Sequence, residues 1–107
     1  MRQELLPGTL DMLILRTVAL TPMHGYAIAQ HMRQVSQDVL QIEEGSLYPA
    51  LQRLLAKKWV KAEWRETPTK RRARYYTITA AGKKQLGEEV ASFERMAEAI
   101  RRVLKHA

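Results

Sequence analysis

The sequence predicts a mostly α-helical fold that contains one small β-hairpin and ends in a long helix. Apolar residues recur at helical spacing in three segments before residue 58. The spacing then changes to alternation between residues 60 and 79, as in paired strands, and a helical pattern resumes after Thr79. A chain of 107 residues that is 46% hydrophobic and 27% charged has the size and composition of one globular domain.

The first two helices are expected in the N-terminal third of the chain. In residues 9–20 the apolar side chains cover two sides of the predicted helix, which indicates burial on more than one face. Residues 21–25 contain proline and glycine and interrupt this pattern. A second amphipathic helix is expected over residues 26–35, and a short extended piece around residues 39–42.

The third helix is predicted to start near Ser46 and to end near Lys57. Ser46 is a suitable N-cap, and Pro49 fits the first turn because its missing N–H leaves no helical hydrogen bond unmade. The apolar side of this helix consists of four leucines at helical spacing: Leu47, Leu51, Leu54 and Leu55. The opposite side is therefore expected to be exposed.

Two alternating runs on either side of the segment TPTKRRA predict the hairpin, whose tip is basic. They cover residues 60–65 and 74–79, and Thr79 is a suitable cap for the last helix. In that helix one set of apolar residues is spaced alternately four and three apart, which is typical of a seam between helices. The seam consists of Leu86, Val90, Phe93, Ala97, Ile100 and Leu104.

This order of elements is that of a winged helix-turn-helix, in which one helix enters the major groove of DNA. Because the leucines of the third helix face the core, the groove-facing residues are expected to be Ser46, Tyr48, Pro49, Gln52 and Arg53. Gln52 suits adenine, and Arg53 suits guanine or a phosphate. Each good bidentate base contact contributes about 1–3 kcal/mol of discrimination.

Positive charge is concentrated in and around the hairpin. The chain carries a net charge of +7, and residues 57–84 contain ten Lys or Arg residues against two acidic ones. Four cations near the tip are expected to neutralise phosphates or to enter the adjacent minor groove of double-stranded DNA. These cations are Lys70, Arg71, Arg72 and Arg74.

The start of the second helix is a further candidate phosphate site. His24, Gly25 and Tyr26 lie where the first N–H groups of a helix have no helical partner. For two of the candidate DNA contacts, Tyr26 and Tyr48, half-buried packing is the alternative interpretation.

The sequence resembles the PadR-like transcriptional regulators along essentially its whole length. The sequence segments that carry the resemblance are LPGTLDMLIL, HGYAI, EEGSLYPALQRL, RRARYYTIT and the following AAG. The resemblance implies a homodimer, usually a repressor of a neighbouring gene that binds an inverted-repeat operator. It also implies that DNA is contacted by Tyr48, Pro49 and the arginines of the hairpin, which is called the wing in this fold. In some members a small hydrophobic or aromatic ligand causes the protein to release its operator.

One departure from the family pattern lies between the third helix and the hairpin. Where the family commonly has glycine followed by leucine, this chain has Lys58 and Trp59. A lysine in a left-handed C-cap costs about 1 kcal/mol or moves the end of the helix. The sequence leaves open how this affects the angle between the third helix and the wing.

Residues 80–107 are predicted to be a dimerisation helix packed on the winged domain of residues 1–79. One domain cannot cover both the seam and the second apolar side of the first helix, so we expect a two-fold homodimer. In addition to the seam, Leu10 and Leu13 are expected at the interface. The alternative is that the seam folds back on its own domain.

An apolar effector pocket is expected beside the seam. Phe93, Met96 and Ile100, with Leu13 and Met12 across the interface, could line a site for a small hydrophobic or aromatic ligand. The alternative interpretation is plain core packing.

The composition excludes several other functions. There is no cysteine, and His24 and His31 have no carboxylate at ligand spacing, so no metal or other cofactor is expected. No phosphate loop or nucleophile motif is present, which argues against an enzyme. The lack of a signal peptide or spanning segment indicates a cytoplasmic protein without a membrane partner.

The alternative function is a winged protein-interaction module that does not read DNA, although the basic wing argues against it.

Overall fold

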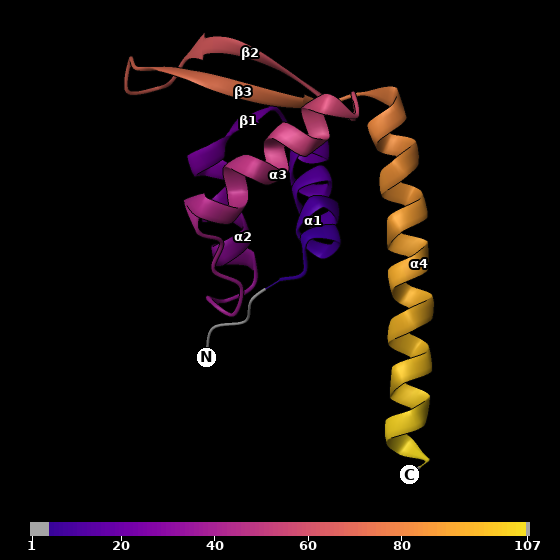
Figure 1. Cartoon of the computed structure of the whole chain (residues 1–107). Helices are drawn as coiled ribbons and strands as arrows, with labels where there is room; N and C mark the ends of the chain where they lie inside the picture. Colours follow the sequence, from indigo (N-terminus) through magenta and orange to yellow (C-terminus); the bar gives the residue numbers. More distant parts are fainter. Residues whose placement is uncertain (1–4, 107) are drawn as a thin grey trace.

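The computed structural model describes residues 5–106 and has the predicted fold class. Its elements follow the chain in the order α1 (Pro7–Leu20), β1 (Met23–His24), α2 (Gly25–Val35), α3 (Glu44–Ala56), β2 (Val60–Glu66), β3 (Arg72–Ile78) and α4 (Ala80–Lys105). In Figure 1 the helices α1, α2 and α3 lie together beneath the sheet, the β2–β3 hairpin projects to one side, and α4 runs down the other side.

The sheet has three antiparallel strands in the order β1-β3-β2. Of the extended piece expected around residues 39–42, the structure has a single bridge residue, Leu40. The sequence analysis did not identify the short strand β1, which lies before α2 and pairs with β3. After α2 the chain turns instead, and Gln37 and Asp38 take left-handed φ values of 53° and 65°. The β2–β3 hairpin is confirmed, with a register that pairs Val60 with Ile78.

One hydrophobic core joins the three N-terminal helices to the base of the hairpin. Three of the four predicted leucines of α3 are at most 1% exposed, and Leu55 packs against the core in a partly buried position. The buried cluster consists of Leu10, Ile14, Leu15, Val18, Ile28, Met32, Leu47, Ala50, Leu51, Leu54, Val60, Tyr76 and Ile78. Since this core holds one side of α3, the other side of that helix is exposed.

The first turn of α3 differs from the prediction in two respects. The helix begins at Glu44 after the N-cap Glu43, so Ser46 lies inside the first turn and is not the cap. A carboxylate in this turn, that of Glu44, stabilises the positive end of the helix dipole. Pro49 therefore lies within the helix, where the carbonyl of Gly45 receives no hydrogen bond from it.

The junction between α3 and β2 takes the left-handed conformation expected at Lys58, whose φ is 61°. The N–H of Lys58 donates to the carbonyl of Leu55 at 3.0 Å, and the N–H of Trp59 donates to that of Leu54 at 3.0 Å. These two bonds form a Schellman motif with lysine where glycine is usual. The helix ends at Ala56, so the lysine has not displaced the end of the helix.

The beginning of α4 is fixed to this junction. The prediction that Thr79 caps the helix is confirmed, since its Oγ1 accepts from the N–H of Gly82 at 3.0 Å. The same hydroxyl donates to the carbonyl of Lys58 at 2.8 Å. Beyond the partly buried Leu86, much of the 26-residue helix projects past the winged domain, as Figure 1 shows.

Candidate nucleic-acid interface

The exposed side of α3 carries four of the five residues expected at the major groove. Ser46, Tyr48, Pro49 and Gln52 are all exposed, and Tyr48 is 44% exposed. They lie opposite the buried leucines of the same helix. A helix exposed along one side and held by a core along the other can enter a major groove.

Arg53, the fifth residue, has a partner inside the protein instead. Its Nη2 donates to Asp11 Oδ1 at 2.8 Å and its Nε donates to Asp11 Oδ2 at 3.3 Å. The hydrogen bond with Asp11 raises the pKa of the Arg53 guanidinium above its ordinary value, against a smaller effect of burial. Two parallel bonds of this kind fix orientation, so Arg53 positions α3 on α1. Sequence spacing could not reveal this contact, because the two residues are 42 positions apart.

The three candidates at the start of α2 have different surroundings. His24 caps the helix, since its Nδ1 accepts from the N–H of Ala27 at 3.2 Å, and its ring meets that of Tyr75 edge-on at 5.3 Å. Gly25 is buried, and a Cβ there would lie 3.1 Å from the Tyr48 ring. Only Tyr26 projects freely, with 68% of its side chain exposed.

The register of the hairpin divides its side chains between two faces. The inner face continues from the buried Val60, and it carries Trp64 on β2 opposite Arg74 on β3. Arg72 lies on the same face, with its guanidinium 5.6 Å from the centre of the Trp64 ring. Sequence reasoning missed Trp64 as a surface residue, because alternation alone places it with the core residues.

The outer face of the hairpin carries Arg65, which is occupied by its neighbours. Its guanidinium forms an ion pair with Glu63 and lies 5.5 Å from the centre of the Tyr75 ring. The wing cations therefore differ, since Arg72 and Arg74 belong to the inner face whereas Arg65 belongs to the outer one.

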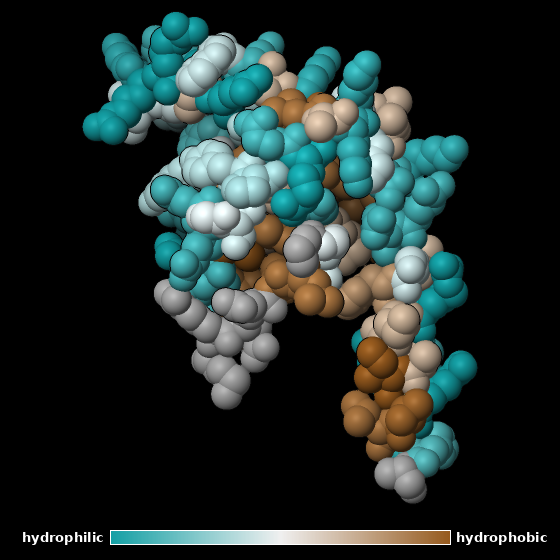
Figure 2. All heavy atoms as spheres, in the orientation of Figure 1, coloured by the Kyte–Doolittle hydropathy of each residue, from teal (hydrophilic) through white to brown (hydrophobic). Residues whose placement is uncertain are grey.

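At the tip of the hairpin, the predicted Lys70 and Arg71 are fully on the surface. The backbone of Thr67 bonds with those of Lys70 and Arg71, and its hydroxyl accepts from the N–H of Arg71 at 3.1 Å. Lys70 has a left-handed φ of 62°. The turn thus holds two adjacent cations at the end of the molecule, where Figure 2 shows a hydrophilic projection.

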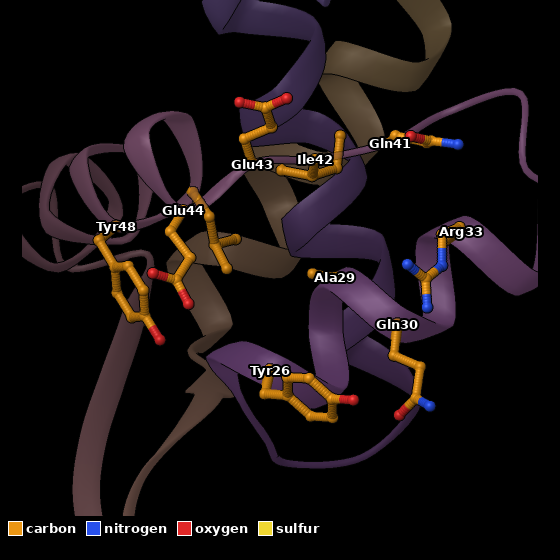
Figure 3. Close-up of a pocket in the computed structure, with 10 residues that line it drawn as sticks. Tyr26, Ala29, Gln30, Arg33, Gln41, Ile42, Glu43, Glu44 and Tyr48 are labelled. Atoms are coloured by element: carbon orange, nitrogen blue, oxygen red, sulfur yellow. The ribbon is translucent and has the colours of Figure 1, made fainter. Parts of the chain in front are cut away.

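A hollow of about 280 Å³ lies between α2 and the start of α3. Figure 3 shows Glu44 and Tyr48 of α3 on one side of it, and Tyr26 and Arg33 of α2 on the other. With Glu43 also at its edge, this hollow contains two carboxylates, which disfavour a phosphate.

The apolar residues of α4 form a surface that is exposed in the single chain. The exposed fractions are 50% for Phe93, 63% for Met96, 51% for Ile100 and 74% for Leu104, whereas Val90 and Ala97 are partly buried. Figure 2 shows these apolar side chains gathered on the projecting part of the helix. This exposure contradicts the alternative in which the whole seam folds back on its own domain.

The sequence analysis assigned three residues of α1 to the interface or the effector pocket, and these residues differ in their exposure. Leu10 and Met12 are 3% and 7% exposed within their own domain, so neither offers a surface to a partner. Leu13 is partly exposed and lines a hollow of about 320 Å³ between α1 and the end of α2. Of the three, Leu13 alone can contact a second chain.

Residues 5–106 contain neither a candidate metal site nor a helix that could span a membrane. Within that part of the chain, no three His, Cys, Asp or Glu residues are grouped as a metal ion requires. Nor does any helix there have the length and apolar character needed to cross a membrane.

The comparisons with known proteins agree with this geometry. The model of the transcriptional regulator PadR-like family matches residues 14–88. An uncharacterized protein of Lysinibacillus sphaericus is 32% identical over 99 residues, which are 92% of this chain and 91% of that protein.

Two solved structures are also similar. A transcriptional regulator from Clostridium thermocellum has a TM-score of 0.81 at 28% identity, over 89% of this chain and 92% of that one. A PadR family transcriptional regulator from Eggerthella lenta has a TM-score of 0.80 at 28% identity, over 94% of this chain and 85% of that one. The chain therefore belongs to the PadR-like family of transcriptional regulators and has the fold of a DNA-binding regulator.

Proposed function

We propose that this protein is a cytoplasmic repressor that binds an inverted-repeat operator as a homodimer. The observation that carries the proposal is the shared position of two surfaces: the exposed side of α3 adjoins the inner face of a cationic wing. In this arrangement α3 occupies the major groove while the wing contacts the flanking backbone.

Sequence reading is assigned to the exposed side of α3. Gln52 is the residue suited to a bidentate contact with adenine, and Ser46 can bond to either a base or a phosphate. Tyr48 and Pro49 contribute shape and apolar contact. Arg53 supports this surface through Asp11, which accepts hydrogen bonds from two of its nitrogens.

The homodimer is supported by the exposed seam of α4. Phe93, Ile100 and Leu104 form an apolar strip that a second copy would cover, and Leu13 lies beside a hollow that could receive apolar side chains. A two-fold dimer presents two α3 helices to major-groove segments one helical turn apart, about 34–36 Å.

An apolar effector site is placed at the same seam. Phe93, Met96 and Ile100 would line it once a second copy closes the space, and the buried Met12 would not. Planar aromatic compounds that bind there would raise the thermal unfolding midpoint of the dimer. They would also lower its affinity for the operator.

The decisive experiment is a titration of DNA from upstream of the protein's own gene, at several salt concentrations. The logarithm of the affinity should fall linearly with the logarithm of the salt concentration. The double substitution Arg71→Ala and Arg72→Ala should reduce that slope by about two, since each phosphate contact contributes about one.

Two results would contradict the proposal. One is binding that ignores both the DNA sequence and the loss of the wing arginines. The other is a stoichiometric complex with a different protein without any affinity for DNA, which would favour the interaction-module alternative.

A further inference from the structure

A second pocket, of about 270 Å³, opens between the start of α2, the exposed side of α3 and the inner face of the wing. Five aromatic side chains from five elements line it: His24 of β1, Tyr26 of α2, Tyr48 of α3, Trp64 of β2 and Tyr76 of β3. Arg74 of β3 provides its cation. Unlike the hollow in Figure 3, it has no acidic residue among the described residues that line it.

Trp64 is the residue that the winged domain alone does not explain. Its side chain is 60% exposed although its strand neighbours on the same face, Ala62 and Val60, are covered by the core. The guanidinium of Arg72 lies 5.6 Å from the ring centre, which limits the positions the ring can take. With Tyr26 and Tyr48, which line the same pocket and are 68% and 44% exposed, Trp64 forms an exposed aromatic patch, and such a patch marks a binding surface.

Gly25 allows the pocket to form. A Cβ at this position would lie 3.1 Å from both Cε1 and Oη of Tyr48, so the glycine leaves room for that ring against the first turn of α2. The ring of Tyr48 thereby forms one wall, while Tyr26, which is 68% exposed, stands at the rim.

The chemistry of the pocket matches one unit of a nucleic-acid backbone. A guanidinium binds a phosphate through parallel hydrogen bonds, and tyrosine hydroxyls can donate to the same oxygens. Aromatic faces pack against the apolar side of a sugar or a base. If α3 lies in the major groove and the wing in the adjacent minor groove, one DNA strand must pass between them, and the pocket lies there.

We propose that this pocket receives one phosphate of the DNA backbone together with its deoxyribose, and that Trp64 contacts DNA through its ring. The proposal rests on the DNA-binding function above and adds to it a contact that does not depend on base sequence. Trp64 and Arg74 therefore affect every duplex alike, whereas Gln52 affects only those that carry its base.

The chain contains two tryptophans, so Trp59→Phe leaves Trp64 as the sole indole. This variant is titrated with a short duplex of random sequence at low salt, where phosphate contacts dominate and no operator is required. The emission of Trp64 should change on binding, and its quenching by acrylamide should fall because the ring leaves water.

Affinity measurements on the same duplex provide the second readout. Trp64→Ala should weaken binding roughly tenfold, as the loss of one aromatic contact does, while Trp64→Phe should retain most of the affinity. Because the ring is largely exposed, both variants should unfold at the wild-type temperature.

Arg74→Ala and Arg65→Ala form a matched pair, since each removes one wing cation from opposite faces of the hairpin. Arg74→Ala should lower the salt slope by about one, and Arg65→Ala should leave it unchanged. Equal effects of the two substitutions would overturn the assignment to the inner face.

Two further outcomes are distinguishable. If the duplex binds while Trp64 emission and the affinity of Trp64→Ala stay at their reference values, the pocket proposal is overturned and DNA binding stands. If no duplex binds at any salt concentration, the proposed function fails and the pocket proposal fails with it.

Discussion

Single backbone positions decide how α3 is joined to the β2–β3 hairpin, which is the wing. Lys58 has two roles, because it closes the Schellman motif and its carbonyl also accepts a hydrogen bond from the hydroxyl of Thr79. Its left-handed φ of 61° is costly for any residue with a Cβ. The local cost is offset by three hydrogen bonds that connect α3, β2 and α4.

Replacing Lys58 with glycine should therefore stabilise the protein. Lys58→Gly removes the Cβ that disfavours the left-handed conformation, so the free energy of unfolding in urea should rise by about 1 kcal/mol. Lys58→Ala is the control, since it removes the same ammonium group and keeps the Cβ. It should change stability little, and an equal gain in both variants would attribute the effect to charge.

Burial also changes the pKa of the phenol of Tyr76. This side chain is 4% exposed, and its burial raises the pKa of the phenol above the ordinary value while nearby Arg74 lowers it. The neutral form is thus favoured by the fold. The contribution of Tyr76 to the free energy of unfolding is therefore complete below the pKa of this phenol in the unfolded chain. It is lost as pH rises through the higher pKa of the phenol in the folded chain.

At the scale of elements, α1 and α4 are each joined closely to α3 or to the junction that follows it. Asp11 of α1 holds Arg53 of α3 through two hydrogen bonds. The first turn of α4 lies against the carbonyl of Trp59, and a Cβ on Gly82 would come within 2.0 Å of that oxygen. The close approach requires glycine, because the obstructing atom belongs to the backbone and cannot rotate away.

Gly82→Ala should destabilise the protein by about 3 kcal/mol, since the start of α4 must move to accommodate the methyl group. Gly87→Ala is the matched control in the same helix, where nothing lies within 4 Å of the added Cβ. It should stabilise the protein by about 1 kcal/mol through helix propensity. Urea unfolding of both variants measures these effects, and similar changes in the two would refute the close-contact argument.

The elements that the sequence predicted correctly are those with a repeated pattern. The leucine side of α3, the alternation in the hairpin and the cap at Thr79 all depend on local spacing. The strand β1 could not be found in this way, because two residues have no period and gain their partner in β3 from far along the chain.

The candidate site was predictable to a similar extent. The exposed side of α3 follows from its buried leucines, so Tyr48 and Gln52 could be placed. Arg53 could not, because its orientation depends on Asp11, 42 residues away. Trp64 was missed because a strand pattern gives the face of a residue but not the point along the strand where the core ends.

At the scale of the whole molecule, the extents of 55 × 32 × 21 Å reflect a helix that is longer than the domain it leaves. A 26-residue helix is about 39 Å long, and the winged domain covers only its first turns. Because the projecting part carries the apolar strip, the same element that exposes hydrophobic surface would also set the distance between two reading helices.

This coupling gives a prediction for dimerisation and DNA binding together. Ile100→Glu places a charge in the seam at a residue that is 51% exposed in the single chain, so the winged domain should fold as before. Sedimentation should show a shift from dimer to monomer. Affinity for a duplex with two inverted half-sites should fall on the order of a hundredfold, since the second half-site contact is no longer linked to the first.

Ala91→Glu is the control for this substitution, because Ala91 lies exposed on the opposite, charged side of α4 beside Glu98 and Arg102. It adds the same carboxylate and should leave both the dimer and the affinity intact. Affinity for a duplex with one half-site should be the same in all three proteins, since each retains an intact winged domain. A monomeric wild type, or an Ile100→Glu variant that remains dimeric and binds both half-sites fully, would show that α4 does not join the two reading helices.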